Sequence, residues 1–97
     1  MHVITRRRLK DFAAVHPPAL APLLAWHKVM ERTDYDSFAD LRGTFPSADL
    51  VAGKTVFNIG GNKYRLIAAV HYNTQIVYAM LFMTHAEYNK DRWKRLL

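Results

Sequence analysis

Hydrophobic and polar positions alternate most regularly in the second half of the chain. Three runs rich in β-branched and aromatic residues are separated by two short polar breaks, Gly60-Gly61-Asn62 and Asn73-Thr74-Gln75. Breaks of this length between such runs are typical of β-hairpins. The pattern predicts an antiparallel meander with strands at residues 55–59, 63–72 and 76–84.

A period of two along the longer strands assigns side chains to faces. In the strand 63–72, Lys63 and Arg65 share a face with Ile67, and the even residues take the other face. In the strand 76–84, one unbroken alternation groups the odd residues from Val77 to Met83. Both faces are largely apolar, which favours central strands covered on at least one side. The alternation does not fix the register between strands, so it leaves open whether the odd residues of both share a face.

A period near 3.6 residues replaces the alternation in the first third of the chain. It predicts a helix from Arg6 that is stopped by Pro17-Pro18, because proline lacks the N–H donor and restricts the preceding residue. Pro18 can open a second helix at its first turn. The second helix carries an apolar stripe made of Leu20, Leu23, Leu24, His27, Met30 and Glu31, with Trp26 and Val29 beside it. The two helices are predicted to form a hairpin that packs on one face of the sheet.

The remaining segments complete the predicted order of elements. Residues 1–5 are β-prone and are predicted to join the sheet as a strand, with Thr5 as N-cap of the first helix. Phe38 and Leu41 predict one short helical turn, residues 44–53 an irregular loop, and residues 86–97 a short basic helix that begins at Thr84 or His85. The fold class is therefore α+β, a twisted antiparallel sheet with a helical hairpin docked against it.

Length and composition restrict the class of protein. Ninety-seven residues, half of them hydrophobic, predict a single domain over residues 1–97. The chain has no cysteine, which excludes disulfides and Cys-based zinc sites. No apolar run approaches the roughly 20 residues of a membrane span, and no signal peptide is evident, so a cytoplasmic protein is expected.

The formal net charge of +6 favours a polyanionic partner such as nucleic acid. The cations are concentrated at the two ends of the chain, and the middle is mildly acidic. The terminal cations are Arg6, Arg7, Arg8 and Lys10, and then Lys90, Arg92, Lys94 and Arg95. This distribution predicts a one-sided basic surface.

Two motifs, together with the order of the elements, resemble a known family. The segments Val56-Phe-Asn-Ile-Gly-Gly-Asn-Lys-Tyr-Arg-Leu-Ile67 and Met83-Thr-His-Ala-Glu-Tyr88, with the Phe45-Pro46-Ser47 segment, are similar to those of the HigB toxins. The resemblance covers nearly the whole chain. It implies a RelE-like fold, an endoribonuclease that cuts mRNA, commonly on the translating ribosome, and neutralisation by a helix-turn-helix antitoxin of the HigA type. Asn89 departs from the family pattern, in which aspartate often follows the tyrosine, and an amide cannot act as a general base.

Cleavage of RNA by its own 2′-hydroxyl needs a base, an acid for the leaving 5′-oxygen, and cations for the phosphorane charge. Arg65, Lys63 and Lys90 are the candidate cations, and His85 and Tyr88 are the candidates for proton transfer. Each has a structural alternative. Arg65 can pair with a carboxylate, Lys63 can be a solvated turn residue, His85 can cap a helix, and Tyr88 can be a core aromatic. Lys90 can be an exposed helix charge.

A second set of residues is suited to hold RNA rather than to cut it. Phosphate contact needs charge but little geometry. The candidates are Arg6, Arg7, Arg8, Lys10, Asn62 and Arg92. The alternatives are a solvated helix face for the cations and turn geometry for Asn62. No His, Asp or Glu set has metal-ligand spacing, so neither a metal nor a cofactor is expected. The competing function is a non-catalytic RNA- or ribosome-binding module, and a purely structural interaction domain is a third.

Overall fold

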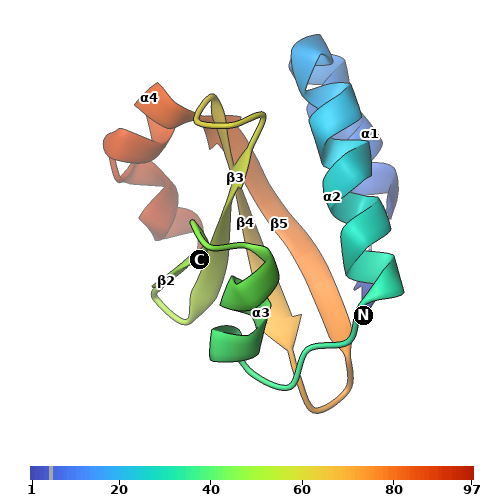
Figure 1. Cartoon of the computed structure of the whole chain (residues 1–97). Coiled ribbons are helices and arrows are strands. Elements are labelled where there is room, and N and C mark those ends of the chain that lie inside the picture. The colour runs from blue at the N-terminus through green and yellow to red at the C-terminus, as the bar shows by residue number, and fades with distance from the viewer. Residues whose placement is uncertain (5) are drawn as a thin grey trace.

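The computed structural model describes residues 1–4 and 6–97, so the predicted N-cap Thr5 lies outside the described residues. Figure 1 shows the arrangement of the elements. In chain order they are β1 (His2–Ile4), α1 (Arg6–Val15), the 3-10 turn η1 (Pro17–Ala19), α2 (Leu20–Arg32), α3 (Phe38–Thr44), β2 (Asp49–Val51), β3 (Lys54–Ile59), β4 (Tyr64–His71), β5 (Ile76–Thr84), α4 (His85–Asn89) and the 3-10 helix η2 (Arg92–Leu96).

The sheet has five strands in the order β1-β5-β4-β3-β2. The predicted meander is confirmed, since β3, β4 and β5 pair antiparallel in sequence order. The sheet is mixed rather than wholly antiparallel, because β1 runs parallel to β5. Side-chain alternation carries no information about strand direction, so the sequence pattern could not distinguish the two pairings.

The edge strand β2 corrects the prediction of an irregular loop over residues 44–53. Val51 pairs with Lys54, so only Ala52 and Gly53 form the turn between β2 and β3. Both have positive φ, 51° and 77°, which is the geometry of a tight two-residue hairpin. The turn reverses the chain at once and lets Asp49–Val51 pair with β3, although Pro46, Ser47 and Asp49 are poor strand formers.

A β-bulge at Met80 divides β5 into two halves. Ala79 lies opposite Ala68 and Leu81 lies opposite Ile67, so Met80 is an extra residue in the ladder. The unbroken alternation predicted for this strand is therefore wrong beyond Met80. Before the bulge, Val77 and Ala79 belong to the core under the helices, and after it Leu81 and Met83 belong to a second cluster.

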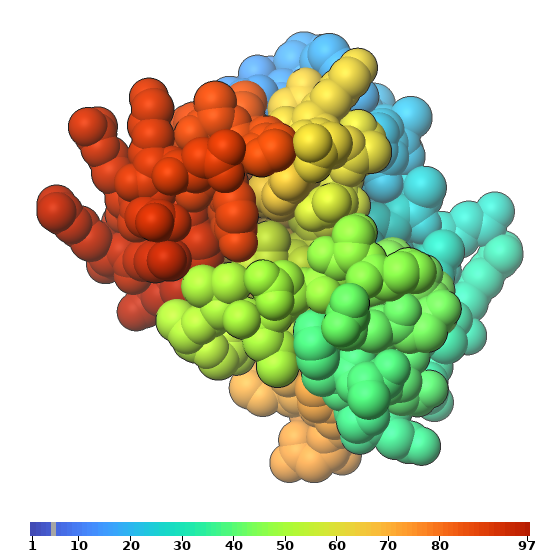
Figure 2. Space-filling model, turned by 60° about the vertical axis from the view of Figure 1, so that its left-hand side comes forward, coloured from blue at the N-terminus to red at the C-terminus, as the bar shows by residue number. Residues whose placement is uncertain are grey.

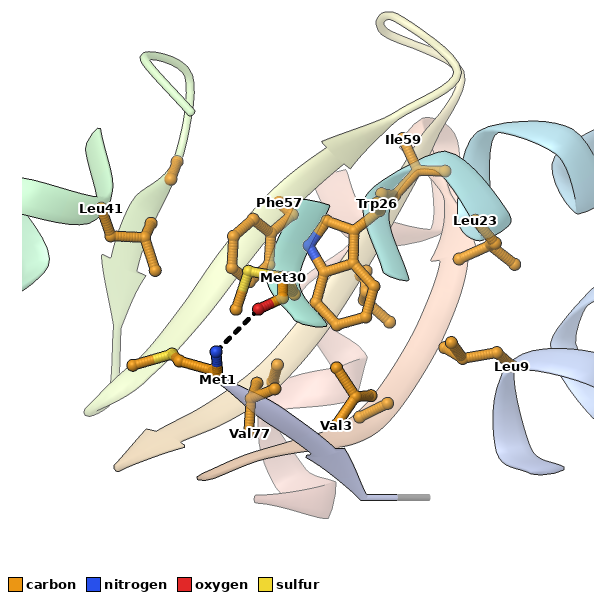
Figure 3. Packing of buried hydrophobic residues seen from close by; sticks show 14 of the residues in the cluster. Met1, Val3, Leu9, Leu23, Trp26, Met30, Leu41, Phe57, Ile59 and Val77 are labelled. Atoms are coloured by element: carbon orange, nitrogen blue, oxygen red, sulfur yellow. Dashed lines mark hydrogen bonds between the residues drawn. The ribbon is translucent and has the colours of Figure 1, made fainter. Parts of the chain in front are cut away.

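The helical hairpin α1–α2 covers one face of the sheet (Figure 1). Figure 3 shows Trp26 and Met30 of α2 beside Phe57 of β3, and Leu23 of α2 belongs to the same cluster. Leu23 and Met30 are buried as predicted, but Leu20 and Leu24 are 46% and 44% exposed. The buried residues are Ala19, Leu23, Trp26 and Met30. Trp26, which was predicted to lie beside the stripe, is part of the buried face because it packs edge-on against Phe57. The amino group of Met1 donates to the carbonyl of Met30 at 2.8 Å (Figure 3).

The C-terminal segment covers the opposite face of the sheet with a smaller cluster of Val56, Ile67, Met83 and Trp93. The predicted single helix over residues 86–97 is broken. Helix α4 ends at Asn89, Asp91 takes a left-handed conformation with φ 59°, and η2 follows. In one continuous helix, Trp93 would lie about 140° round the axis from Tyr88. The break lets both aromatic side chains turn toward the sheet.

Candidate active site

Arg65 lies on the central strand β4, on the face covered by the C-terminal segment. Asn58 of β3 and Met83 of β5 lie opposite it in the ladder. The side chain is only 8% exposed. Among the described residues, no carboxylate lies within ion-pair distance of the guanidinium. Arg65 therefore does not form an ion pair with any acid of the described residues, which was its structural alternative. Burial of a cation without such a partner costs free energy.

The turn between β3 and β4 holds the Arg65 guanidinium. Nη2 donates to the side-chain oxygen of Asn62 at 2.7 Å, and Nη1 donates to the carbonyls of Asn62 and Tyr64 at 3.3 and 3.1 Å. Arginine has five N–H donors, so these three contacts leave at least two for another acceptor. The positive φ values in the turn belong to Gly60 and Gly61, at 64° and 69°. Asn62 therefore does not supply the left-handed turn geometry, and its amide is instead used to orient Arg65.

Tyr88 of α4 covers Arg65. The Arg65 Cζ atom lies 5.6 Å from the centroid of the Tyr88 ring. Tyr88 also stacks on Trp93, with centroids 5.1 Å apart and an interplanar angle of 16°. The indole N–H of Trp93 donates to the Tyr88 carbonyl at 2.9 Å. The phenol ring therefore contacts both a cation and an indole.

Burial raises the pKa of the Tyr88 hydroxyl, and the carboxylates of Asp49 and Asp91 raise it further. The cations of Arg65 and Lys94 act in the opposite direction. The net result is that the phenol keeps its proton at neutral pH. A protonated hydroxyl next to a cation is able to donate a proton to a leaving oxygen.

Helix α4 begins beside the β3–β4 turn. The backbone N–H of His85 donates to the carbonyl of Lys63 at 2.9 Å. Thr84 is the N-cap and forms a capping box with Glu87, and His85 is the first helical residue, so the predicted start at Thr84 or His85 is confirmed. Figure 2 shows the orange start of this segment against the yellow residues of the turn. Five of the predicted site residues, Asn62, Lys63, Arg65, His85 and Tyr88, therefore converge at one end of the sheet.

The other predicted residues lie apart from this group. Lys90 and Arg92 are exposed and line a groove between β5 and the C-terminal segment. Arg6, Arg7, Arg8 and Lys10 are exposed on α1, which packs on the opposite face of the sheet. The guanidinium of Arg8 reaches the edge of β5, where Nη1 donates to the carbonyls of Ala79 and Met80 at 3.3 and 3.4 Å.

Comparison with known proteins identifies the family of this chain. Residues 19–91 match a family model described as HigB_toxin, RelE-like toxic component of a toxin-antitoxin system. The chain belongs to the HigB toxin family. It is 35% identical over 92 residues to the mRNA interferase toxin HigB of Escherichia coli K12, an alignment that covers 92% of this chain and 88% of the relative. It is 27% identical over 93 residues to the mRNA interferase HigB of Escherichia coli O6:H1, with 93% and 90% of the two chains covered.

The structure adds two residues to the candidate site that the sequence analysis did not propose. Asn58 lies directly opposite Arg65, and Asp49 lies opposite Val56 on the same face as Tyr88, whose pKa it raises. Alternation in a hairpin closed at Gly60-Gly61 could have paired Asn58 with Arg65. Asp49 could not have been found, because its strand was not predicted.

No group of three or more His, Cys, Asp or Glu side chains suited to hold a metal ion occurs within residues 1–4 and 6–97. The expectation of a metal-free site remains a prediction. Over the same residues, no helix is both long and apolar enough to cross a membrane.

Proposed function

We propose that this HigB toxin cuts mRNA at the site formed by Arg65, Tyr88 and the β3–β4 turn. Family membership makes the chain the toxic component of a toxin–antitoxin system, with an antitoxin as its partner. Its relatives are named mRNA interferases, and the chain is an endoribonuclease. The reaction we propose is attack of a 2′-hydroxyl on the neighbouring phosphate, without a metal ion.

The buried guanidinium of Arg65 is the observation that supports this proposal most strongly. It has at least two N–H donors beyond those that Asn62 and Tyr64 occupy. Its position on a central strand and under the Tyr88 ring fixes its orientation before substrate arrives. A preorganised donor in a site with little water stabilises charge that develops in the transition state. Arg65 would therefore stabilise the phosphorane, with Lys63 or Lys90 adding positive charge.

Proton transfer falls to Tyr88 and His85 in this proposal. Tyr88 keeps its proton at neutral pH and would donate it to the departing 5′-oxygen. His85, which lies beside Lys63, would accept the proton of the 2′-hydroxyl. Asn89, which follows Tyr88, has no ionisable group and takes neither role.

The remaining predicted residues would hold the RNA and its surroundings. Asn62 and Arg92 would contact RNA near the site, and the α1 cations Arg6, Arg7, Arg8 and Lys10 would contact phosphates of mRNA or of ribosomal RNA. We further propose that cleavage takes place on the translating ribosome in the cytoplasm. The antitoxin would be a helix-turn-helix protein of the HigA type.

Two substitutions test the site directly. Arg65→Met removes the charge and keeps most of the side-chain volume, so the fold should persist. It should lower the cleavage rate about 100- to 1000-fold, as loss of a transition-state donor does. His85→Ala should also abolish growth inhibition. The control is Arg32→Met on α2, an exposed cation at the end of a helix on the other face of the sheet.

New mRNA 5′ ends, mapped after induced expression, give the readout. Breaks confined to translated frames would support action on the ribosome. Full toxicity of both Arg65→Met and His85→Ala at wild-type expression would overturn the assignment of the site. Growth arrest without any mapped break would favour the non-catalytic RNA- or ribosome-binding module instead.

A further inference from the structure

A groove of about 540 Å³ lies between β5 and the C-terminal segment, next to the candidate active site. Its apolar walls come from Leu81 and Met83 of β5 and from Trp93 and Leu96 of η2. Its volume is in the range of pockets that bind one small ligand or one monomer of a polymer. None of the roles proposed for Arg65 or Tyr88 uses it.

The charges at this groove favour an anion. Lys90, Arg92 and Arg95 line it, and none of the three makes an ion pair with any of the described residues. The only acid in the lining is Glu87. Its carboxylate accepts hydrogen bonds from the backbone N–H and the hydroxyl of Thr84, at 3.0 and 3.1 Å. Three available cations therefore face one carboxylate that is already bonded.

The groove is continuous with the candidate active site through two elements. Helix α4 carries both Tyr88, which covers Arg65, and the groove residue Glu87, and the groove residue Lys90 follows as its C-cap. Strand β5 carries Met83, which lies opposite Arg65 in the ladder and also lines the groove. A single strand of nucleic acid with one phosphate at Arg65 would cross α4 and place its next nucleotides in the groove.

We propose that this groove binds a nucleotide of single-stranded RNA that flanks the cleaved bond. Arg92 and Arg95 hold its phosphates, and the apolar walls take its sugar and base. The inference rests on the proposed cleavage at Arg65 for the position of the scissile bond. RNA is favoured over an acidic protein segment because the groove adjoins the site at which RNA is cut and has both an apolar wall and unpaired cations.

The double variant Arg92→Ala/Arg95→Ala tests the groove by binding rather than by cleavage. The probe is a single-stranded oligonucleotide with 2′-O-methyl groups throughout, which cannot undergo 2′-hydroxyl attack. The dependence of log K on log salt is measured for wild type and variant. Each phosphate contact on a single strand contributes about 0.7 to this slope, so loss of two should reduce it by about 1.4. The matched control is Lys28→Ala/Arg32→Ala, which removes two exposed cations of α2 and should leave the slope unchanged.

A polyglutamate peptide and inorganic polyphosphate serve as competing probes. Wild type should bind the oligonucleotide more tightly than either, since only the oligonucleotide has bases for the apolar walls. An unchanged oligonucleotide slope in the Arg92→Ala/Arg95→Ala variant would overturn the inference. Loss of polyglutamate binding in that variant, with oligonucleotide binding intact, would assign the groove to an acidic protein segment.

The binding and cleavage assays together distinguish failure of the groove proposal from failure of the cleavage proposal. If Arg92→Ala/Arg95→Ala lowers the slope of log K against log salt but the wild type never cuts RNA, the groove proposal is supported and the cleavage proposal is refuted. A protein whose cutting depends on Arg65, but whose slope is unaffected by the double variant, would support the cleavage proposal and refute the groove.

Discussion

Substitution of Asn62 tests whether the β3–β4 turn orients the candidate catalytic arginine. Asn62→Ala removes the 2.7 Å contact between the side-chain oxygen and Nη2 of Arg65, and leaves the contact of Nη1 with the Asn62 carbonyl. Asn62 is exposed and does not adopt positive φ, so the turn itself should keep its shape. The expected defect is in the direction of the guanidinium and not in the fold.

The size of the effect follows from the strength of that contact. A hydrogen bond to a charged group contributes about 1.5–3 kcal/mol net. Water can reach exposed Asn62 and replace the lost oxygen in part, so the low end of this range applies. A loss of about 1.4 kcal/mol from the transition state corresponds to a roughly tenfold slower cleavage step. Asn62→Asp should be slower still, because its carboxylate would compete with the phosphate for Arg65.

Single-turnover cleavage of the RNA, compared with thermal unfolding, measures both quantities. The matched control is Asn73→Ala, an exposed asparagine in the turn between β4 and β5 at the other end of the strands. It should cleave at the wild-type rate. A wild-type cleavage rate for both Asn62→Ala and Asn62→Asp, with an inactive Arg65→Met, would show that the turn does not orient Arg65.

Four further changes probe the surroundings of the site. Tyr88→Phe keeps the stacked ring, so it should preserve the melting temperature but lower the cleavage rate, and an unchanged rate would exclude Tyr88 as the acid. Because burial raises the pKa of Tyr88, the pH–rate profile of the wild type should show no inflection from this residue between pH 5 and about 9. Thr84→Ala removes the N-cap of α4 and should cost about 1 kcal/mol of unfolding free energy in urea titrations. The hydrogen bond from the Thr84 backbone lowers the pKa of Glu87, so ionised Glu87 stabilises the fold at pH values above the ordinary glutamate pKa. This contribution is lost as the pH falls through the lowered pKa. Glu87→Gln should flatten that acidic part of the curve of stability against pH, and an identical curve would refute the capping role. Deletion of Met80 removes the bulge but leaves Ala79 opposite Ala68 and Leu81 opposite Ile67, so every later side chain of β5 keeps its present face; cooperative unfolding should persist, and its loss in a circular dichroism melt would contradict the assignment of the bulge.

Local patterns in the sequence were sufficient for the elements that carry the site. The polar breaks at Gly60-Gly61-Asn62 and at residues 73–75 located both turns of the meander, because glycine and asparagine favour tight turns. The strand that carries Arg65 and the capped start of α4 at Thr84 followed from the same kind of local signal. The sequence therefore placed Arg65, His85 and Tyr88 on the correct elements, although their roles stay proposals.

The residues around the site depended on pairings between distant segments. Nothing near Met80 in the chain marks it as a bulge, since the extra residue is defined only by its partners Ile67 and Ala68 on β4. Asp49 reached the site only because a two-residue turn folds a poor strand former back onto β3. These features are set by the neighbouring strand, so alternation along one strand could not predict them.

The sequence by itself determined both turns of the meander, the proline stop after the first helix, the N-cap at Thr84 and the excess of cations at the two ends of the chain. Each depends on the chemistry of a few adjacent residues. Only the tertiary structure decided that Arg65 is buried with no carboxylate of the described residues within ion-pair distance, that Tyr88 contacts both Arg65 and Trp93, and that the terminal cations reach β5 from both faces of the sheet. The reason is physical: burial and contact belong to pairs of residues that the fold brings together, and no local pattern of the chain encodes them.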